Sequence, residues 1–205
     1  MKITDSVIRL DCTKRAYAYA VLGDGVTLID TSFPGRGRKI LRELAGYGIL
    51  PTDIRRILLT HRDPDHVGST AYIAARSGCE VFIGEKDLPY VTGERRIGGE
   101  KGLIGDLLRV KCPEGTRAFD RDIFDGIEVV PTPVHTRGHS SFRFQNVFFA
   151  GDALSSTRNL VSAFPDAHRL DAETCAEFLR GHGISGVEWI CSAHSELLHL
   201  ENVIK

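Results

Sequence analysis

Two histidines and two aspartates crowd one short loop of this chain. The stretch Leu58–Ser69 reads LLTHRDPDHVGS and supplies His61, Asp63, Asp65 and His66. The apolar pattern before it predicts a strand over Ile54–Thr60, which would deliver the loop at its carboxyl end. Open α/β sheets usually place their ligands at that end of their strands. Imidazole and carboxylate groups gathered in this way favour a metal site.

Pro64 should keep the middle of this segment in a loop. Proline cannot donate a backbone hydrogen bond, and it disfavours a helical conformation at the preceding Asp63. We therefore expect the next helix to begin near Val67. Such a loop can serve two ions, one with His61 and Asp63, the other with Asp65 and His66. The alternative is that the acidic residues only cap a helix, a common role for aspartate.

Further potential ligands follow three later apolar segments. A metal with nitrogen and oxygen ligands needs three or four of them, and one loop rarely supplies them all. The runs at 127–130, 147–150 and 187–191 predict strands, and each precedes a potential ligand: His135, Asp152 and His194. His139 has suitable chemistry too. It lies at the end of the turn after His135, and we interpret it as a structural histidine that orients its neighbours.

The order of these motifs resembles the metallo-β-lactamase superfamily. The family pattern is His-x-His-x-Asp-His, then a histidine in a turn, an aspartate after an apolar strand, and a last histidine near the carboxyl terminus. It maps onto His61, Asp63, Asp65, His66, His135, Asp152 and His194. The resemblance spans most of the chain and implies an α/β fold of the αββα type. This is a four-layer sandwich of two mixed sheets flanked by helices, here a single domain over residues 1–205.

The resemblance also implies a binuclear mechanism. His61, Asp63 and His135 would hold one metal, Asp65, His66 and His194 the other, and Asp152 would bridge them. In such sites two ions about 3.5–4 Å apart activate a shared water, and the hydroxide attacks the substrate. The substrate would be a small-molecule ester, thioester, lactone, amide or phosphoester. We assign Asp65 and Asp152 to catalysis as well, and Asp30 to a hydrogen bond that supports the loop.

Three positions depart from the family pattern. Asp63 replaces the second histidine of the loop, Val134 stands where glycine is usual before His135, and His194 follows Ser-Ala rather than Pro-Gly. A carboxylate favours iron or manganese more than imidazole does, although zinc is still the first expectation. Two alternatives to hydrolysis stay open. One is a diiron redox domain served by a separate electron-donor protein, and the other is a metal-bound ligand-binding protein with little turnover.

A glycine-rich segment at about 84–125 separates the metal loop from His135. Long segments of this kind inside a compact domain are usually functional or disordered. We interpret it as a partly helical flap over the site that sets substrate choice. Its cations Arg95, Arg96 and Lys101 either meet an anionic substrate group or form a solvated charged face. The second interpretation is preferred, because charge runs are usually solvated.

Apolar periodicity predicts the remaining elements. Strands are expected at 6–10, 16–21, 26–29, 79–83, 126–132, 141–144, 147–150 and 187–191. Helices are expected at 35–47, 67–77, 171–181 and 196–204. Tight turns at 22–25 and 145–146 should join neighbouring strands. The strand, metal loop, helix and strand between 54 and 83 should form a right-handed βαβ unit.

Charge and composition are those of an ordinary globular protein. A net charge of -1 gives no electrostatic case for nucleic acid or a membrane surface. The amino-terminal residues lack the apolar run of a signal peptide or membrane anchor. Five cysteines without a C-x-x-C pair predict reduced thiols, with Cys191 packed in the core. We expect a cytoplasmic protein, with His168, His182 and His199 solvated. The motifs do not set oligomeric state.

Overall fold

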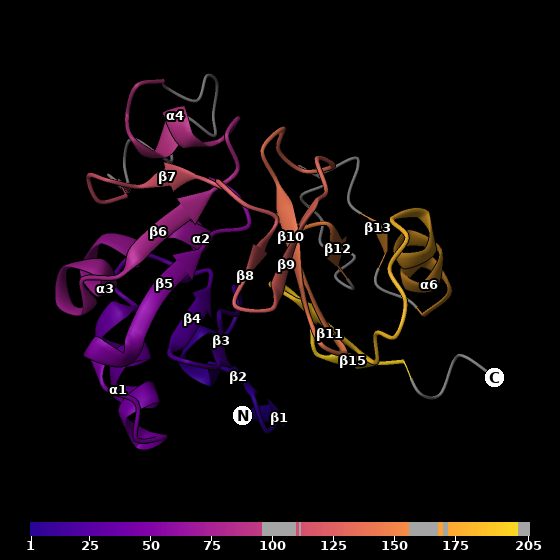
Figure 1. The fold of residues 1–205 in the computed structure, drawn as a ribbon, viewed down its shortest axis with the longest axis horizontal. Helices are drawn as coiled ribbons and strands as arrows, with labels where there is room; N and C mark the ends of the chain where they lie inside the picture. Colours follow the sequence, from indigo (N-terminus) through magenta and orange to yellow (C-terminus); the bar gives the residue numbers. More distant parts are fainter. Residues whose placement is uncertain (96–109, 111, 156–167, 170–171, 201–205) are drawn as a thin grey trace.

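Two β-sheets face each other at the centre of the computed structural model, and helices cover their outer faces (Figure 1). The structure describes residues 1–95, 110, 112–155, 168–169 and 172–200. Within them, one sheet has seven strands in the order β1-β2-β3-β4-β5-β6-β7. The other has six, in the order β15-β14-β11-β10-β9-β8. The expected fold of two mixed sheets with flanking helices is confirmed.

The first sheet comes from the amino-terminal part of the chain. Its strands are β1 (Lys2–Thr4), β2 (Val7–Arg9), β3 (Tyr19–Leu22), β4 (Val26–Ile29), β5 (Ile54–Leu58), β6 (Glu80–Ile83) and β7 (Arg117–Ala118). Strands β1 to β4 pair antiparallel, whereas β4 to β7 pair parallel. Parallel neighbours need crossover connections. Helix α1 (Gly37–Gly46) joins β4 to β5, and α2 (Pro64–Val67) with α3 (Thr70–Ser77) joins β5 to β6. The carboxyl ends of β4 and β5 therefore lie at one edge.

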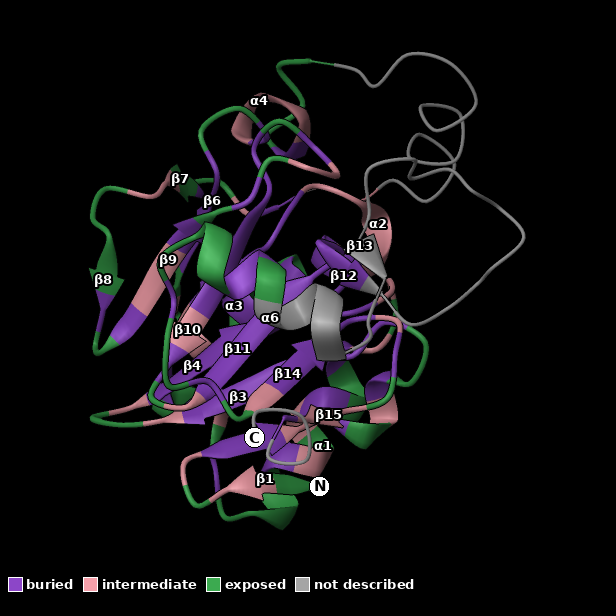
Figure 2. Ribbon diagram, turned by 90° about the vertical axis from the view of Figure 1, so that its right-hand side faces the viewer, coloured by how far each residue is buried: buried purple, intermediate pink, exposed green. Residues whose placement is uncertain are grey.

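The second sheet brings three more strand ends to one edge. Its strands are β8 (Ile123–Phe124), β9 (Ile127–Pro131), β10 (Ser140–Phe144), β11 (Val147–Gly151), β14 (Trp189–Ser192) and β15 (Leu198–His199). Strand β10 runs antiparallel to both β9 and β11, and β11 runs parallel to β14. Strands β9, β11 and β14 consequently point the same way. Helix α6 (Ala172–Gly181) packs over the outer face of this sheet (Figure 2). A small parallel pair of strands, β12 (Leu154–Ser155) and β13 (His168–Arg169), lies beside α6.

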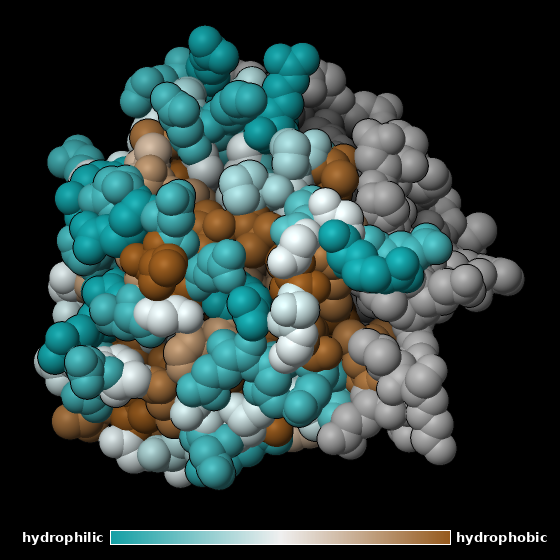
Figure 3. Space-filling view, turned by 45° about the vertical axis from the view of Figure 1, so that its right-hand side comes forward, coloured by the Kyte–Doolittle hydropathy of each residue, from teal (hydrophilic) through white to brown (hydrophobic). Residues whose placement is uncertain are grey.

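Alternating side chains of the strands fill three apolar layers. Ile57 belongs to the layer under α1 and α3, whereas its neighbour Leu58 faces the second sheet. Phe149 lies between the sheets, and Phe148 packs toward α6. Each such side chain stabilises the fold by about 1.5–3 kcal/mol when it is fully buried. Strands β4, β11 and β14 are accordingly coloured mostly as buried in Figure 2, and hydrophilic side chains cover much of the described surface on the face shown in Figure 3.

Two of the expected helices differ in the structure. Helix α2 begins at Pro64 rather than near Val67, because the fixed φ of proline suits the first position of a helix. Asp63 stays extended before it, as proline requires. The helix expected at 196–204 is also wrong in its described part. Residues 198–199 form β15, which pairs antiparallel with β14, so pairing with a neighbouring strand overrides the local helical pattern. Residues 201–205 lie outside the described residues.

The flap expected at 84–125 is described in part. It contains α4 (Leu88–Val91) and the short strands β7 and β8. Residues 96–109 and 111 lie outside the described residues, and with them the cations Arg96 and Lys101. In Arg95, the backbone N–H donates to the carbonyl of Pro89 at 2.8 Å. The role of this segment in substrate choice stays a prediction.

Histidines and cysteines away from the expected site are mostly packed. His199 is not solvated as expected, because it is half-buried and stacks on Trp189 with ring centroids 3.9 Å apart. His182 is exposed on one side and stacks on Phe178. The side chains of His168 and Cys175 lie outside the described residues. Cys12, Cys79, Cys112 and Cys191 are free thiols, and Cys191 is fully buried between the sheets. None of the described helices is both long and apolar enough to cross a bilayer.

Candidate metal centre

Strand ends from both sheets meet at one edge of the sandwich. The end of β5 leads into the loop that carries four expected ligands, while β9, β11 and β14 precede His135, Asp152 and His194. The sheets are linked there by the backbone N–H of Ser140, which donates to the carbonyl of Thr60 at 2.9 Å. The structure thus brings together all the side chains that the sequence predicts at the site: His61, Asp63, Asp65, His66, His135, Asp152 and His194.

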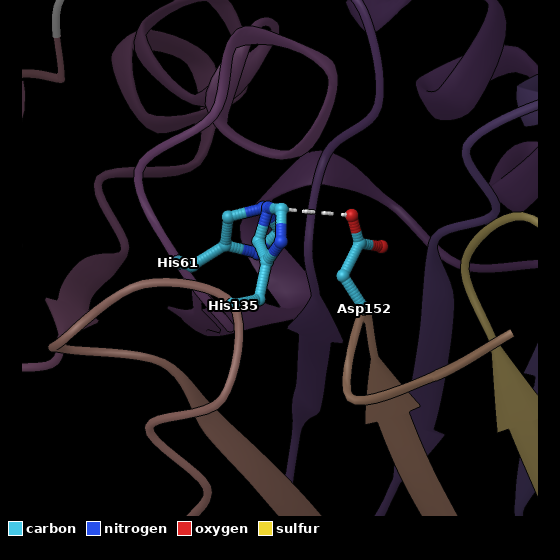
Figure 4. Close-up of side chains that lie close together, drawn as sticks. All are labelled: His61, His135 and Asp152. Carbon is cyan, nitrogen blue, oxygen red and sulfur yellow. Dashed lines mark ion pairs between the residues drawn. The ribbon is translucent and has the colours of Figure 1, made fainter. Parts of the chain in front are cut away.

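The first cluster consists of His61, Asp63 and His135. Asp63 Oδ2 lies 3.2 Å from His135 Nε2 and 3.8 Å from His61 Nε2. The same two nitrogens lie 3.6 and 3.8 Å from Asp152 Oδ2. In Figure 4 the two imidazole rings lie close together and face the Asp152 carboxylate across a short gap. Donor atoms from four side chains therefore surround one space.

The second cluster consists of Asp65, His66 and His194. His194 Nε2 lies 3.3 Å from Asp65 Oδ2. The Nε2 atoms of His194 and His66 lie 3.2 and 3.3 Å from Asp152 Oδ1. Asp152 therefore stands between the clusters, with Oδ2 toward the first and Oδ1 toward the second.

These donors fit divalent metal ions. His61, His66 and Asp152 are 0%, 1% and 4% exposed. His61 Nε2, His66 Nε2 and Asp152 Oδ1 are buried and have no hydrogen-bond partner among the described residues. Buried polar atoms are normally satisfied, and leaving them unsatisfied is unfavourable. Ions at these positions would satisfy them, and imidazole nitrogens with carboxylate oxygens suit zinc, iron and manganese.

The far sides of the imidazole rings are held by hydrogen bonds. Nδ1–H of His66 donates to Asp30 Oδ2 at 2.8 Å, and Nδ1–H of His61 donates to Thr60 Oγ1 at 3.0 Å. The Thr60 hydroxyl in turn donates to Asp30 Oδ2. His194 Nδ1–H donates to the carbonyl of Arg15. With the protons on Nδ1, the Nε2 lone pairs face the clusters, as metal-ligating histidines require.

Asp30 supports the metal loop as expected. Its Oδ1 accepts the backbone N–H of Thr60 at 2.8 Å, in addition to the two bonds made by Oδ2. Asp30 adopts a φ of 58°, in the left-handed region that most residues avoid. One buried carboxylate thus ties the end of β4 to the end of β5 and to a histidine of the second cluster.

His139 contacts the back of Asp152 rather than the clusters. Its Nε2 accepts the backbone N–H of Asp152 at 3.2 Å, and its Nδ1–H donates to Thr132 Oγ1 at 2.8 Å. Burial lowers the pKa of His139 to about 3, so the ring is neutral near pH 7. A neutral ring with its proton on Nδ1 can accept this backbone bond and thereby orient Asp152.

The electrostatics of the site keep Asp152 ionised. Burial alone would raise the pKa of this carboxyl, but His66, His194 and His61 together hold it well below its usual range. Burial, with His66 nearby, lowers the pKa of His61. Burial opposes protonation of His66 too, yet the carboxylates of Asp152, Asp30 and Asp65 raise its pKa. A metal in the second cluster would therefore displace a proton from His66.

Two residues that organise the site were not predicted from the sequence. Thr60 connects Asp30 to His61, and Asp87, which is fully buried, contacts the metal loop and the turn after His135. Asp87 follows the end of β6 by four residues. A charged residue just after a strand, on the same edge as the metal loop, was the signal that could have identified it.

A family comparison decides the family of the chain. The model of the metallo-β-lactamase superfamily matches residues 14–194, which is most of the sequence. The chain belongs to the metallo-β-lactamase superfamily. This match covers the residues of both clusters, Asp152 included.

Curated relatives of this superfamily member are distant. A probable metallo-hydrolase from Methanocaldococcus jannaschii is 24% identical over 143 residues, which are 67% of this chain and 66% of the relative. A hydroxyacylglutathione hydrolase from Cereibacter sphaeroides is 30% identical over 156 residues, 72% of this chain and 51% of the relative. The chain thus spans between about half and two thirds of the length of these relatives.

Solved structures of the superfamily share the fold. A metallo-β-lactamase family protein from Thermus thermophilus has a TM-score of 0.69 at 21% identity, and the match covers 97% of this chain and 76% of that chain. A metallo-β-lactamase from Cronobacter sakazakii has a TM-score of 0.69 at 17% identity, with 94% of this chain and 79% of that chain covered. At these identities the likeness concerns the fold alone.

Proposed function

We propose that this protein is a binuclear metal-dependent hydrolase that acts on a small molecule. The observation that carries the proposal is Asp152, whose two oxygens face two separate clusters of nitrogen and oxygen donors. Membership of the superfamily and the hydrolase names of its relatives support hydrolysis in general terms. Two divalent ions, with zinc as the first expectation and iron or manganese as alternatives, would supply Lewis acidity and a water with its pKa lowered to about 7.

The residues of the chain divide this work between them. His61, Asp63 and His135 would hold one ion, and Asp65, His66 and His194 the other. Asp152 would contact both. Each cluster then offers two imidazoles and one carboxylate of its own, in addition to the shared Asp152. The replacement of a histidine by Asp63 therefore makes the two clusters chemically alike.

The substrate is proposed to approach over the second cluster. The side chains of Asp65 and His194 are each 25% exposed, whereas those of His61 and His135 are fully buried. Asp65 therefore stands at the open side of the site, where its carboxylate can accept a hydrogen bond from the attacking water. This placement agrees with the catalytic role assigned to Asp65, while Asp152 is closed in from solvent.

The expected substrates are a small-molecule ester, thioester, lactone, amide or phosphoester. The names of the relatives include hydroxyacylglutathione hydrolase, which favours thioesters as the first class to screen. Screening should also include lactones and phosphodiesters. The metal motif does not determine the substrate, which depends on the residues that would line the pocket.

A second candidate is a diiron redox domain that works with a separate electron-donor protein. The position of Asp63 favours it, since its carboxylate lies 3.2 Å from His135 and gives the first cluster a harder donor than imidazole. Metal identity separates the two proposals. Iron with a visible charge-transfer band favours the redox domain, and zinc or manganese favours the hydrolase.

Substitution of Asp152 tests the hydrolase directly. Asp152→Asn keeps the shape of the side chain but removes the charge shared by the clusters. We expect it to lose both ions and to lower hydrolysis by more than about 100-fold, since even partners of metal ligands change activity by 10–100-fold. Glu128→Gln, on β9 and paired with Arg143, is the matched control and should behave as wild type. A wild-type protein loaded with two ions that hydrolyses no substrate class would contradict the proposal.

A further inference from the structure

One buried carboxylate at the metal-centre edge belongs to neither cluster. Asp87 is 0% exposed and lies between the end of β6 and α4. Its Oδ1 accepts Arg62 Nη1–H at 2.8 Å, and its Oδ2 accepts the backbone N–H of Arg62 at 3.3 Å. The hydroxyl of Thr136 also donates to Oδ2. A buried carboxylate paired in this way is strongly localised, because the loss of one partner would leave a charge uncompensated.

The two partners of Asp87 are chain neighbours of two side chains in the first cluster. Arg62 immediately precedes Asp63, and Thr136 immediately follows His135. Asp63 Oδ2 and His135 Nε2 lie 3.2 Å apart, although the two residues follow strands of different sheets. Asp87 therefore bonds both loops one residue away from the point where their side chains meet.

Close backbone packing leaves the three loops little freedom. A Cβ on Gly138 would lie 2.6 Å from the backbone nitrogen of Asp87, and a Cβ on Gly84 would lie 1.9 Å from the carbonyl oxygen of Gly138. The Arg62 guanidinium also stacks on the ring of Tyr90 in α4, 4.1 Å from its centroid. The loop after β6, the metal loop and the turn after His135 are thus pressed together around Asp87.

We propose that Asp87 is a positioning residue that sets the separation of Asp63 and His135, and thereby the affinity of the first cluster for its metal ion. This inference rests on the proposed metal centre. The second cluster should be largely independent of Asp87, because its two histidines are held instead by other groups, His66 by Asp30 and His194 by the carbonyl of Arg15. Asp87 would thus affect the binding affinity of only one of the two ions.

Substitutions of Thr136 test this role with little disturbance of the core. Thr136→Val removes the hydroxyl that bonds Asp87, whereas Thr136→Ser keeps it. Thr116→Val is the matched control, since Thr116 is also buried but its hydroxyl bonds the carbonyl of Pro113 and the thiol of Cys112 rather than Asp87. Metal-free proteins would be titrated with cobalt(II), and visible absorption would report coordination geometry and affinity at each site.

We expect Thr136→Val to weaken the binding of one of two cobalt ions by roughly 10–100-fold and to change its absorption bands. Thr136→Ser and Thr116→Val should bind both ions as wild type does. Asp87→Asn should give the same one-ion defect as Thr136→Val, or a larger one. The inference is overturned if both ions bind Thr136→Val with wild-type affinity and spectra, or if Thr116→Val shows the same loss.

The outcomes separate this inference from the proposed function. In one outcome the wild type binds two cobalt ions and Thr136→Val selectively loses one, but no substrate class is hydrolysed. That result would support the role of Asp87 and contradict the hydrolase. Hydrolysis by the wild type, with unchanged metal binding in Thr136→Val, would support the hydrolase and contradict the role of Asp87. A wild-type protein that takes up no metal would overturn both.

Discussion

At the scale of single residues, Asp63 distinguishes this chain from the family pattern. Its carboxylate lies 3.2 Å from His135 Nε2 and 3.8 Å from His61 Nε2, among the donors of the first cluster. Asp63 is the N-cap residue of α2, but its side chain makes no capping hydrogen bond and lies instead beside the histidines of the first cluster. As a proposed ligand, the Asp63 carboxylate would make the donor set of the first cluster harder rather than remove a donor from it.

Asp63→His should shift the metal preference of the first cluster. A third imidazole makes the donor set softer, so the affinity for zinc should rise relative to manganese, on the order of tenfold. Competition titrations with the two ions measure the ratio directly. Asp53→Asn offers a charge-matched control, because Asp53 is exposed and its carboxylate bonds the backbone N–H of Leu50. An unchanged ratio in Asp63→His would show that Asp63 is not a ligand.

His139 should make the fold sensitive to acid. Burial lowers its folded-state pKa to about 3, whereas an unfolded histidine titrates near about 6.5. Below the higher value the unfolded chain binds a proton that the folded protein excludes. The free energy of unfolding therefore decreases as the pH is lowered below about 6.5. For this residue the decrease is up to about 1.4 kcal/mol per pH unit, and it ends as the pH approaches the folded-state pKa.

His139→Gln should flatten this dependence. Urea unfolding of the metal-free proteins between about pH 7 and about pH 4 measures the free energy of unfolding at each pH. The slope of this free energy against pH is compared between wild type and His139→Gln. The variant is expected to be less stable at neutral pH, since the bond to the backbone of Asp152 is altered, but to lose less stability on acidification. Equal slopes in the two proteins would contradict the assignment of a neutral, buried His139.

At the scale of elements, the end of β11 has a strict backbone requirement. Gly151 has a φ of 54°, and a Cβ there would lie 2.8 Å from His139 Nε2 and 2.9 Å from Thr60 Cβ. A left-handed conformation and a crowded neighbourhood both exclude a side chain. Because Asp152 follows directly, this glycine lets β11 deliver the carboxylate between the two clusters.

Gly151→Ala should therefore damage both stability and metal binding. The strain and overpacking together should lower the free energy of unfolding by about 2–4 kcal/mol. Gly46→Ala, in the last position of α1, is the control, because a Cβ there meets nothing within 4 Å. It should leave stability within about 1 kcal/mol of wild type and metal content unchanged. Similar effects of the two substitutions in chemical denaturation would refute this account of β11.

Sequence periodicity predicted most strands but not every boundary. The strands before Asp30, His61, His135, Asp152 and His194 were expected within a few residues of their observed limits. Helix α2 starts earlier than expected because proline can open a helix as well as interrupt one. The segment at 198–199 became a strand because β14 offered it a pairing partner, and that information is absent from its local pattern.

At the scale of the whole molecule, the candidate site forms only when the two sheets pack together. His61, Asp63, Asp65 and His66 follow a strand of the first sheet, whereas His135, Asp152 and His194 follow strands of the second. The ligand types and their order could be read from the sequence, since a metal site needs specific donors. The roles of Thr60 and of the carbonyl of Arg15 could not, because their partners are set by tertiary packing and have no fixed spacing along the chain. Asp87 could be marked as a candidate by its place just after β6, but not its bonds to Arg62 and Thr136.

The central claim is that one chain binds two ions through matched clusters joined by Asp152. Elemental analysis of the purified protein tests it most directly, because it gives both metal identity and the number of atoms per chain. We predict close to two atoms of one element per chain, with zinc first. A single atom per chain, or none after incubation with excess zinc, manganese or iron, would contradict the binuclear centre.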